Sequence, residues 1–465
     1  MAQNQAGESL ASRQAVIIGG GLAGIAAAIE LADLGWKVRL LERRPYLGGR
    51  VFSFTDKESN QEIDNGQHVF MKCCTSYTHL LEKLGVAHKT TVQRRMRVPV
   101  INARQRRADL YSAPLWPPPL HLAPALLRYR HLSFGDRLRV AWASARMRLM
   151  SRRTRDRLDN VSFYDWLKAH GQRDSAIDGF WNFVILPTLN DEPRRVSAAQ
   201  AIMVFQDGFL TTVHGADIGY ASVGLSHLLY QEAQRYIEAR GGTVLLDHNA
   251  AKLDGDGAGI TRLRIHERGV MHADAYVLAV PPREMADLLP EPLRLHDFFR
   301  RAAKLAMSPI VNVHLWYDRP VMVHAFAAFP DSDAHWVFNK SLILGDTTGH
   351  GQYIAVSLSG AHKFIDMPKD EIRAKFVEEM PRLLPRAQGA TVTRCVIVKE
   401  RHATFRPSPG AAAGRLPQRT PVPNLFLAGE WTDTGWPSTM ESAVRSGELC
   451  AREIAGKPRK VAAQP

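Results

Sequence analysis

The run GGGLAG at residues 19–24 has glycines at the spacing G-x-G-x-x-G, which can bind the pyrophosphate of a dinucleotide. Gly19 permits a tight turn, Gly21 lets the backbone approach the pyrophosphate, and Gly24 lets a helix pack closely on a strand. The first turn of such a helix has free N–H groups and the positive end of the helix dipole. Glu42 follows at the end of the next apolar run, where a carboxylate accepts both ribose hydroxyls and disfavours a 2′-phosphate.

Two further segments favour FAD over NAD. Gly48-Gly49-Arg50 lies where an extended FAD would continue from its adenosine, and it combines backbone access with one positive charge. The turn DNGQH at residues 64–68 is composed mainly of small and polar residues and suits the edge of an isoalloxazine ring.

The C-terminal part of the chain has a matching set of polar groups. Glu430 ends the run LAGE and is suited to accept from a ribityl hydroxyl. Residues 438–441, STME, have the S-x-x-E form of a capping box and predict a helix with Ser438 as its N-cap. The positive end of that helix would stabilise the anionic N1/O2 edge of a reduced flavin. No cysteine precedes this loop to attach a flavin, so we expect non-covalent binding.

These residues need elements that bring distant segments together. The apolar run at 14–19, the small-residue helix that ends at Gly35 and the run at 37–41 predict a βαβ unit. Strand patterns return after Gly241 and again at residues 424–429, and helices are expected at 134–150, 164–187, 369–384 and 439–454. The alternation predicts an α/β fold, in which a Rossmann-like FAD-binding domain of the glutathione-reductase type is interleaved with an α+β substrate domain.

The FAD-binding domain is predicted to be discontinuous, with residues 12–85, 219–288 and 398–456. Residues 86–218 and 289–397 form the predicted substrate domain, which faces a membrane. The ends of the chain, 1–11 and 457–465, are expected to be flexible tails. The polar N-terminal residues do not have the pattern of a secretory signal.

Four cysteines, without C-x-x-C spacing, are expected to be reduced thiols of a cytoplasmic enzyme. His, Cys and carboxylate residues show no spacing typical of a metal site, so no metal is expected.

Positive charge is concentrated in one segment. Of the net charge of +14, residues 94–157 carry sixteen arginines and three aspartates, which is +13. The same segment contains the uncharged stretch 110–127, whose five prolines exclude a membrane-spanning helix. An ordinary solvated surface and a nucleic-acid site are alternatives, but no recognised nucleic-acid module accompanies the arginines. We favour peripheral docking on an anionic membrane, with Leu115, Trp116, Leu120, Leu122, Leu126 and Leu127 entering the interface and Arg128, Arg130, Arg137, Arg139 and Arg146 meeting phosphates.

The motifs GGGLAG, GGR, DNG and LFLAGEWTDTG together resemble the flavin amine oxidase and carotenoid desaturase superfamily. Within it, DNGQHV, the central block FWNFVILPTLNDEPRRVSA and the run AGEWTDTGWPSTMESAVRSG are similar to the hydroxysqualene dehydroxylases, or squalene-associated FAD-dependent desaturases. One departure is that residues 308–312 have no lysine, whereas flavin amine oxidases usually carry one there. The resemblance implies FAD contacts at Gly19, Gly21, Leu22, Ala23, Gly24, Glu42, Gly49, Arg50, Gly66, Gln67, His68, Ala251, Gly429, Glu430, Thr439 and Met440.

This resemblance implies a bacterial enzyme of squalene and hopanoid biosynthesis that replaces the hydroxyl of hydroxysqualene with hydride from reduced FAD. Such a reaction needs an acid, and the candidates are His68 and Asp217, with structural roles as the alternative for both. The aromatic residues Phe180, Trp181 and Phe183 are candidates for a tunnel wall, with core packing as the alternative. No second dinucleotide motif is present, so the electron donor is unidentified. The alternatives are a carotenoid desaturase of the phytoene type, another amine-oxidase-like oxidoreductase, and a non-catalytic isoprenoid-binding protein.

Overall fold

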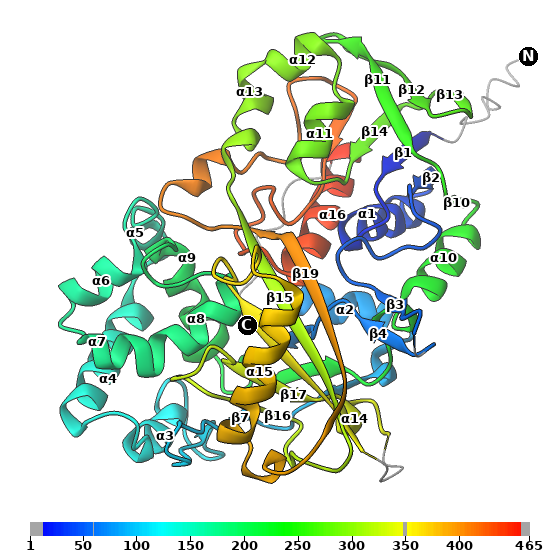
Figure 1. The fold of residues 1–465 in the computed structure, drawn as a ribbon. Coiled ribbons are helices and arrows are strands. Elements are labelled where there is room, and N and C mark those ends of the chain that lie inside the picture. The colour runs from blue at the N-terminus through cyan, green and yellow to red at the C-terminus, as the bar shows by residue number, and fades with distance from the viewer. Residues whose placement is uncertain (1–12, 59, 347–350, 457–465) are drawn as a thin grey trace, which may run out of the picture.

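The computed structural model describes residues 13–58, 60–346 and 351–456. The predicted tails lie outside this range. A parallel sheet of five strands has the order β10-β2-β1-β14-β20, so segments from the beginning, middle and end of the chain lie side by side (Figure 1). Its strands are β1 (Gln14–Ile18), β2 (Lys37–Leu41), β10 (Thr243–Leu245), β14 (Ala275–Leu278) and β20 (Leu425–Leu427).

Side chains of this sheet alternate between two cores, as strand geometry requires. Ala15 and Ile17 of β1 pack among the helices on one face, while Val16 and Ile18 join a core on the other face. The helices of the first face include α1 (Leu22–Asp33), α2 (Thr75–Lys83), α10 (Tyr230–Glu238) and α16 (Met440–Ile454). The second face is covered by β11 (Ala250–Asp256), β12 (Gly259–Ile265), β13 (Gly269–Met271), α11 (Pro282–Leu288), α12 (Glu291–Leu295) and α13 (Asp297–Arg300). Both faces of the sheet are therefore buried.

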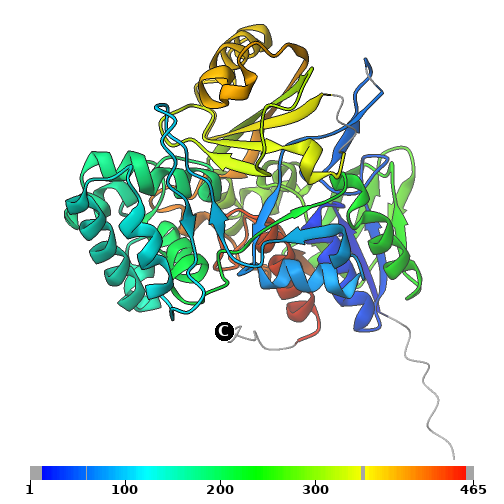
Figure 2. The ribbon, with the colours of Figure 1, turned by 90° about the horizontal axis from the view of Figure 1, so that it is seen from below.

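An antiparallel sheet with the order β16-β17-β18-β15-β19 forms a second layer (Figure 2). Its strands are β15 (Met307–Tyr317), β16 (Phe326–Ala328), β17 (Trp336–Asn339), β18 (Gln352–Ser359) and β19 (Val392–Phe405), and α14 (Lys340–Ile343) follows β17. The helix α15 (Lys369–Leu383) packs on one face of the sheet, where Ile372 and Phe376 belong to the same core as Val311 and Val313. The opposite face points toward the middle of the molecule.

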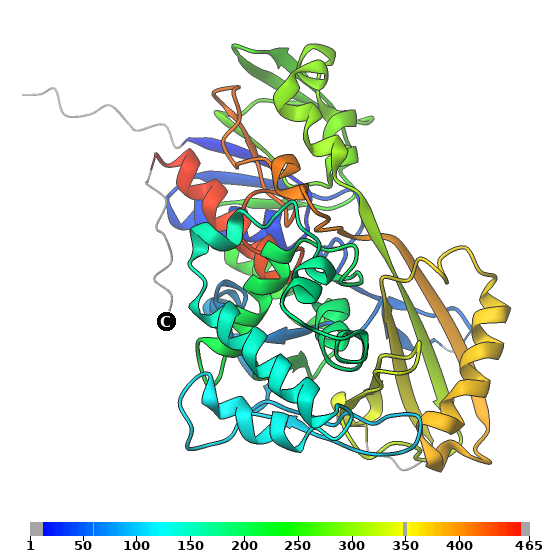
Figure 3. The ribbon, with the colours of Figure 1, turned by 90° about the vertical axis from the view of Figure 1, so that its left-hand side faces the viewer.

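A group of helices forms the third part of the molecule (Figure 3). These helices are α3 (Ala123–Arg128), α4 (Phe134–Leu149), α5 (Arg152–Asp156), α6 (Phe163–Ala169), α7 (Asp174–Ala176), α8 (Asn182–Leu189) and α9 (Ala198–Met203), with two π-helical segments at Ile177–Trp181 and Val204–Leu210. Short strands connect this part to the rest: β3 (Ser53–Thr55), β4 (Glu62–Asp64), β5 (Val69–Met71), β6 (Thr90–Val92), β7 (Arg97–Val98), β8 (Leu110–Tyr111) and β9 (Ile218–Ala221).

The structure corrects three details of the sequence analysis. The helix expected over 164–187 is interrupted after α6, where Gly171 has a φ of +74° that ends a helical turn. The predicted domain boundary between residues 397 and 398 falls inside β19, which pairs with β15 from Val392 to Phe405. The boundary between 218 and 219 divides β9 in the same way.

Candidate functional site

One cavity of about 1320 Å³ extends from the end of β1 to the antiparallel sheet and the α8–α9 helices. Gly21, at the start of α1, and Met440, at the start of α16, line this same cavity. The two helices pack against each other along their length. The N-terminal glycine motif and the C-terminal loop and helix therefore meet at one cavity, as the predicted FAD site requires.

The glycine motif forms the first end of the cavity. Gly21 is the N-cap of α1 and makes no side-chain capping bond, so the N–H groups of the first turn remain available to a ligand. A Cβ on Gly24 would lie 1.9 Å from the carbonyl oxygen of Gly19, which shows why this helix needs glycine there. Glu42 accepts hydrogen bonds from the N–H groups of Gly20 (2.8 Å) and Arg44 (3.0 Å), so its carboxylate is held at the cavity wall.

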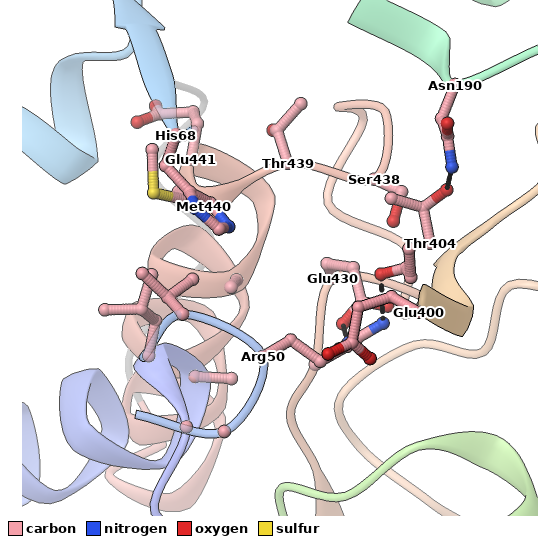
Figure 4. Close-up of a pocket in the computed structure, with 18 of the residues that line it drawn as sticks. Arg50, His68, Asn190, Glu400, Thr404, Glu430, Ser438, Thr439, Met440 and Glu441 are labelled. Carbon is pink, nitrogen blue, oxygen red and sulfur yellow. Dashed lines mark hydrogen bonds and ion pairs between the residues drawn. The ribbon is translucent and has the colours of Figure 1, made fainter. Parts of the chain in front are cut away.

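Arg50 and Glu430 lie next to each other in the cavity wall (Figure 4). The Arg50 guanidinium pairs with the Glu430 carboxylate and also donates to the carbonyl of Ala403 at 3.0 Å. Behind them, the buried guanidinium of Arg415 donates to the carbonyl oxygens of Glu430 (3.1 Å) and Thr432 (2.7 Å). Burial lowers the pKa of Arg415 to about 10, which leaves it charged at neutral pH. The loop after β20 is thus held by an internal cation rather than by regular structure.

The amino end of α16 opens on the cavity, but its cap differs from the predicted one. Thr439, not Ser438, is the N-cap, and its hydroxyl accepts from the N–H of Ser442 at 3.3 Å. Glu441 does not complete a capping box, because it accepts from the N–H groups of Ser76 (3.1 Å) and Tyr77 (2.8 Å) at the start of α2. The buried Ser438 hydroxyl borders the cavity and has no hydrogen-bond partner within the described ranges. It is therefore available to a bound group.

Of the sixteen predicted contact residues, only Gly24 is not at the cavity surface, and its role is to let α1 approach β1. The cavity wall includes the others: Gly19, Gly21, Leu22, Ala23, Glu42, Gly49, Arg50, Gly66, Gln67, His68, Ala251, Gly429, Glu430, Thr439 and Met440.

The two acid candidates have different positions. His68 lines the cavity, and its Nδ1 lies 3.1 Å from the carbonyl oxygen of Gly66. Burial lowers its pKa, so it is a poor source of protons at neutral pH. Asp217 is fully buried away from the cavity surface and accepts from the N–H of Met96 (2.7 Å), with His214 Nδ1 also at 2.7 Å. Of the two alternatives for Asp217, these contacts support the structural role.

A lysine that the sequence analysis missed supports the 64–68 turn. Lys340, at the start of α14, is buried and bonds Asp64 at 2.8 Å and Gln67 at 3.0 Å. Burial raises the pKa of Asp64, but the charge of Lys340 and the hydrogen bonds from Lys340, Ser53 and the Leu225 N–H together more than offset it, so the pKa lies below its usual range. The strand β15 carries Asn312 at the cavity, and its amide donates to the Asn65 carbonyl at 3.0 Å. The loop is thus held by α14 and by β15 of the second sheet.

The far part of the cavity has a largely apolar wall. It is formed by Met71, Met96, Val98, Leu110, Phe183, Val184, Pro187, Met203, Val204, Phe209, Ala216, Ile218, Ile310, Trp336 and Phe338. Of the three predicted tunnel aromatics, Phe183 is at the wall, whereas Trp181 is fully buried in the helical core and Phe180 packs against that core.

Several polar groups interrupt this wall, and sequence reasoning missed them. Asn190, with a φ of +54°, donates to Thr404 Oγ1 at 2.8 Å (Figure 4). Asp207 lies on the π-helical segment, and burial raises the pKa of its carboxyl despite the opposing charges of nearby arginines. Such segments occur often at functional sites, but their signal is absent from sequence periodicity.

Comparison with known proteins identifies the chain. It matches the family described as flavin containing amine oxidoreductase over residues 22–455. The chain belongs to this family.

It is 28% identical to the zeta-carotene desaturase of Zea mays, over 95% of this chain and 83% of that protein. It is 26% identical to the zeta-carotene desaturase of Synechocystis sp., over 94% of this chain and 96% of that protein. The putrescine oxidase structure with bound putrescine covers 96% of this flavin amine oxidoreductase and 99% of its own chain, with a TM-score of 0.72 and 18% identity, and shows the shared fold.

This flavin amine oxidoreductase is an FAD-dependent oxidoreductase, and its cavity fits that cofactor. Gly21 and Gly49 approach each other closely at the cavity wall, where a Cβ on Gly49 would lie 3.1 Å from the Cα of Gly21. The uncapped first turn of α1 would hold the phosphates, and the Ser438 hydroxyl and the amino end of α16 would be available to the flavin half of the cofactor.

Among the described residues, no cluster of three or more His, Cys, Asp or Glu side chains could bind a metal ion, and the four cysteines are unpaired thiols. Nor does any helix in the described ranges have the length and apolarity to cross a membrane.

Proposed function

We propose that this protein transfers hydride between FAD and a long isoprenoid chain held in the apolar part of the cavity. The observation that carries the proposal is the continuity of one cavity, which joins the residues suited to FAD with a wall of apolar side chains. Apolar pockets with few polar groups bind apolar ligands and fix their orientation at those groups. Bound FAD supplies a hydride acceptor when it is oxidised and a hydride donor when it is reduced.

The residues of this chain would position the reaction. Arg50, Glu430 and the amino end of α16 would hold the flavin half of the cofactor. Phe183, Trp336 and Phe338 would exclude water from the substrate carbon that reacts. Asn190 and Thr404, hydrogen-bonded to each other, would set the limit between the polar and apolar parts of the cavity.

Desaturation of a polyene is the first candidate, because the desaturases of Zea mays and Synechocystis sp. match nearly the whole chain. In this reaction the substrate would lose hydride from one carbon to oxidised FAD and a proton from the neighbouring carbon to solvent, and a double bond would form between the two carbons.

Reductive dehydroxylation of hydroxysqualene to squalene is the second candidate, and Asp207 favours it. Burial raises the pKa of the Asp207 carboxyl, and in its protonated form this group can donate a proton to the allylic hydroxyl. The C–O bond then breaks, water leaves, and the allylic cation takes up hydride to give the hydrocarbon. The Asp207 carboxylate is left to be reprotonated from solvent. The sequence resemblance of the 428–447 run supports the same reaction.

Paired turnover assays with the purified holoprotein separate the two reactions. Reduced enzyme would be mixed with hydroxysqualene under anaerobic conditions and analysed for squalene. Oxidised enzyme would be mixed with phytoene or zeta-carotene and analysed for products with additional double bonds. Squalene alone supports dehydroxylation, and more desaturated polyenes alone support desaturation. Flavin absorbance with neither product, and with isoprenoid retained on the protein, would assign it instead to the non-catalytic isoprenoid-binding class.

A further inference from the structure

The helix α4 exposes an apolar stripe on the side away from the core. Its buried side chains are Asp136, Val140, Ala143 and Met147. With 3.6 residues per turn, the exposed apolar side chains occupy a sector of about 80° on the opposite side of the helix. These are Phe134, Leu138, Trp142 and Leu149, of which Trp142 is 61% and Leu149 is 84% exposed. One apolar face is enough to pack α4 against the protein core. A second apolar face that is exposed to water indicates a surface that contacts a partner.

Arginines border the stripe on both sides. By the same geometry, Arg139 and Arg146 fall on one side of it, and Arg137 and Arg148 on the other. Arg137 and Arg139 are held by the protein, since Arg137 donates to the carbonyl of Leu127 at 2.6 Å and Arg139 pairs with Asp136. Arg146 and Arg148 are exposed and make no hydrogen bond or ion pair with another described residue. An apolar stripe between two basic rows is typical of helices that lie in a membrane interface.

The proline-rich segment before α3 extends the same surface. Leu115 is 92% exposed, and Trp116, Leu120 and Leu127 are also exposed. Leu122 and Leu126, which the sequence analysis also expected at the interface, are partly buried and pack against the helical core. Of the exposed large apolar side chains in the described residues, eight of fifteen lie within residues 115–149. Figure 3 shows α3 and α4 together on one side of the molecule, in cyan.

This surface lies over the apolar end of the cavity. Val98 and Leu110, which line the cavity, are paired across the β7–β8 ladder. Tyr111, the next residue, accepts a hydrogen bond from Arg128 of α3 at 2.6 Å, and α3 packs beside β8. The apolar end of the cavity is therefore separated from the exposed surface by one strand pair and one short helix.

We propose that the surface formed by residues 115–149 docks on an anionic lipid bilayer, with the α4 stripe and the Leu115–Trp116 turn in the interface. The bilayer offers both an apolar interior and negative headgroups, which match the two kinds of side chain on this surface. A second copy of the chain would present the same positive charge and be repelled, and a nucleic acid would leave the apolar stripe without a partner. The inference does not depend on which isoprenoid reacts, since vesicle binding is measured without turnover.

Flotation of the FAD-loaded protein with lipid vesicles tests the inference. Phosphatidylcholine vesicles would be compared with vesicles that also contain phosphatidylglycerol. We expect the wild type to bind the anionic vesicles. The variants Trp142→Ser/Leu149→Ser and Arg146→Gln/Arg148→Gln should each bind them roughly tenfold more weakly or worse. The matched control is Arg294→Gln/Leu295→Ser on α12, which removes an exposed arginine and an exposed leucine elsewhere and should bind as the wild type does.

Flavin absorbance and the melting temperature of each variant show that the fold is retained. Failure of the wild type to bind anionic vesicles, or equal binding by all the variants, would overturn the inference. A wild-type dimer that the Trp142→Ser/Leu149→Ser variant dissociates, with unchanged vesicle binding, would assign the surface to a second copy and overturn it as well.

Discussion

Arg50 donates a hydrogen bond to the carboxylate of Glu430, which lies 380 residues further along the chain. Glu430 is buried beside the cavity, and Arg50 is its cationic partner. The two residues come from the N-terminal and C-terminal motifs, so this pair joins the two parts of the predicted FAD site.

Replacement of Arg50 by Ala should weaken FAD binding, because it leaves the Glu430 carboxylate without its cation and removes a positive charge from the cavity. A hydrogen bond between charged groups contributes roughly 1.5–3 kcal/mol, so the Kd for FAD should rise about tenfold to a hundredfold. Fluorescence titration of the apoprotein with FAD measures this. Arg319→Ala, which breaks an exposed pair with Asp318 far from the cavity, is the control. An unchanged Kd in Arg50→Ala would contradict the assigned site.

Replacement of Gly447 by Ala should destabilise the packing of α16 against α1. A Cβ on Gly447 would lie 2.4 Å from the Ala23 carbonyl oxygen and 2.6 Å from the Ala27 nitrogen, both on the backbone of α1. We expect a loss of about 1–3 kcal/mol in the free energy of unfolding, with weaker FAD binding because α1 and α16 must move apart. Urea unfolding measures the first effect. Gly257→Ala is the control, since its Cβ would meet nothing within 4 Å.

Replacement of Asp207 by Asn tests the proton donor. If dehydroxylation is the reaction, the rate of squalene formation should fall about a hundredfold or more, with FAD content unchanged. Asp178→Asn is the control, because burial also raises the pKa of Asp178, but its side chain does not line the cavity. Full activity in Asp207→Asn would remove Asp207 from the mechanism.

The same variant has a predicted effect on stability. The folded protein holds the Asp207 proton more tightly than the unfolded chain, since burial raises this pKa. This group therefore favours the folded state at low pH, and its contribution is lost as the pH rises above the unfolded pKa of about 3.9. Asp207→Asn should then be more stable than the wild type at neutral pH. Thermal unfolding at several pH values checks the sign, and a variant less stable at neutral pH would contradict it.

His314 should make the protein sensitive to mild acid. Its ring is buried, with Nδ1 2.7 Å from the Tyr353 hydroxyl, and burial together with the charge of Lys340 lowers its pKa to about 3. Below the unfolded pKa of about 6.5 the unfolded chain binds the proton and the folded protein does not, so stability falls as the pH falls. Between pH 7 and about pH 5 this group should cost about 2 kcal/mol.

The variant His314→Gln should lose less stability over the same pH interval, even if it is less stable than the wild type at neutral pH. Urea unfolding at the two pH values measures the difference. His88→Gln, at an exposed position, should keep the pH dependence of the wild type. Identical pH dependence in His314→Gln and the wild type would contradict the assignment.

The FAD residues could be predicted because their signals are local. The glycine spacing of residues 19–24 and the strand ends at Glu42 and Glu430 depend on neighbours in the chain, and the structure brings these residues to one cavity. The prediction of Ser438 as the N-cap was wrong because the outcome depended on a contact that is not local. Glu441 had a partner outside its own helix, at the start of α2, and such a partner has no trace in local sequence.

The substrate end could not be predicted, since its residues come from elements whose pairing is not local. The strand β19, which carries Glu400 and Thr404 to the cavity, was missed because its alternation is weak and it is held by its long ladder with β15. The α4 stripe was missed for a related reason: the helix is apolar on two sides, and only the packed structure shows which side is buried.

The sequence by itself determined the nucleotide-binding motif, the two ends of the chain that form the FAD site and the concentration of arginines in one segment. Glycine spacing, strand ends and charge are properties of a few adjacent residues, so they can be recognised before folding is considered. Tertiary structure alone decided that Asp207 faces the cavity, that Asp217 does not, and which apolar face of α4 meets solvent. Burial is a relation between distant parts of the chain, and it sets both the pKa of a carboxyl and the surface left for a partner.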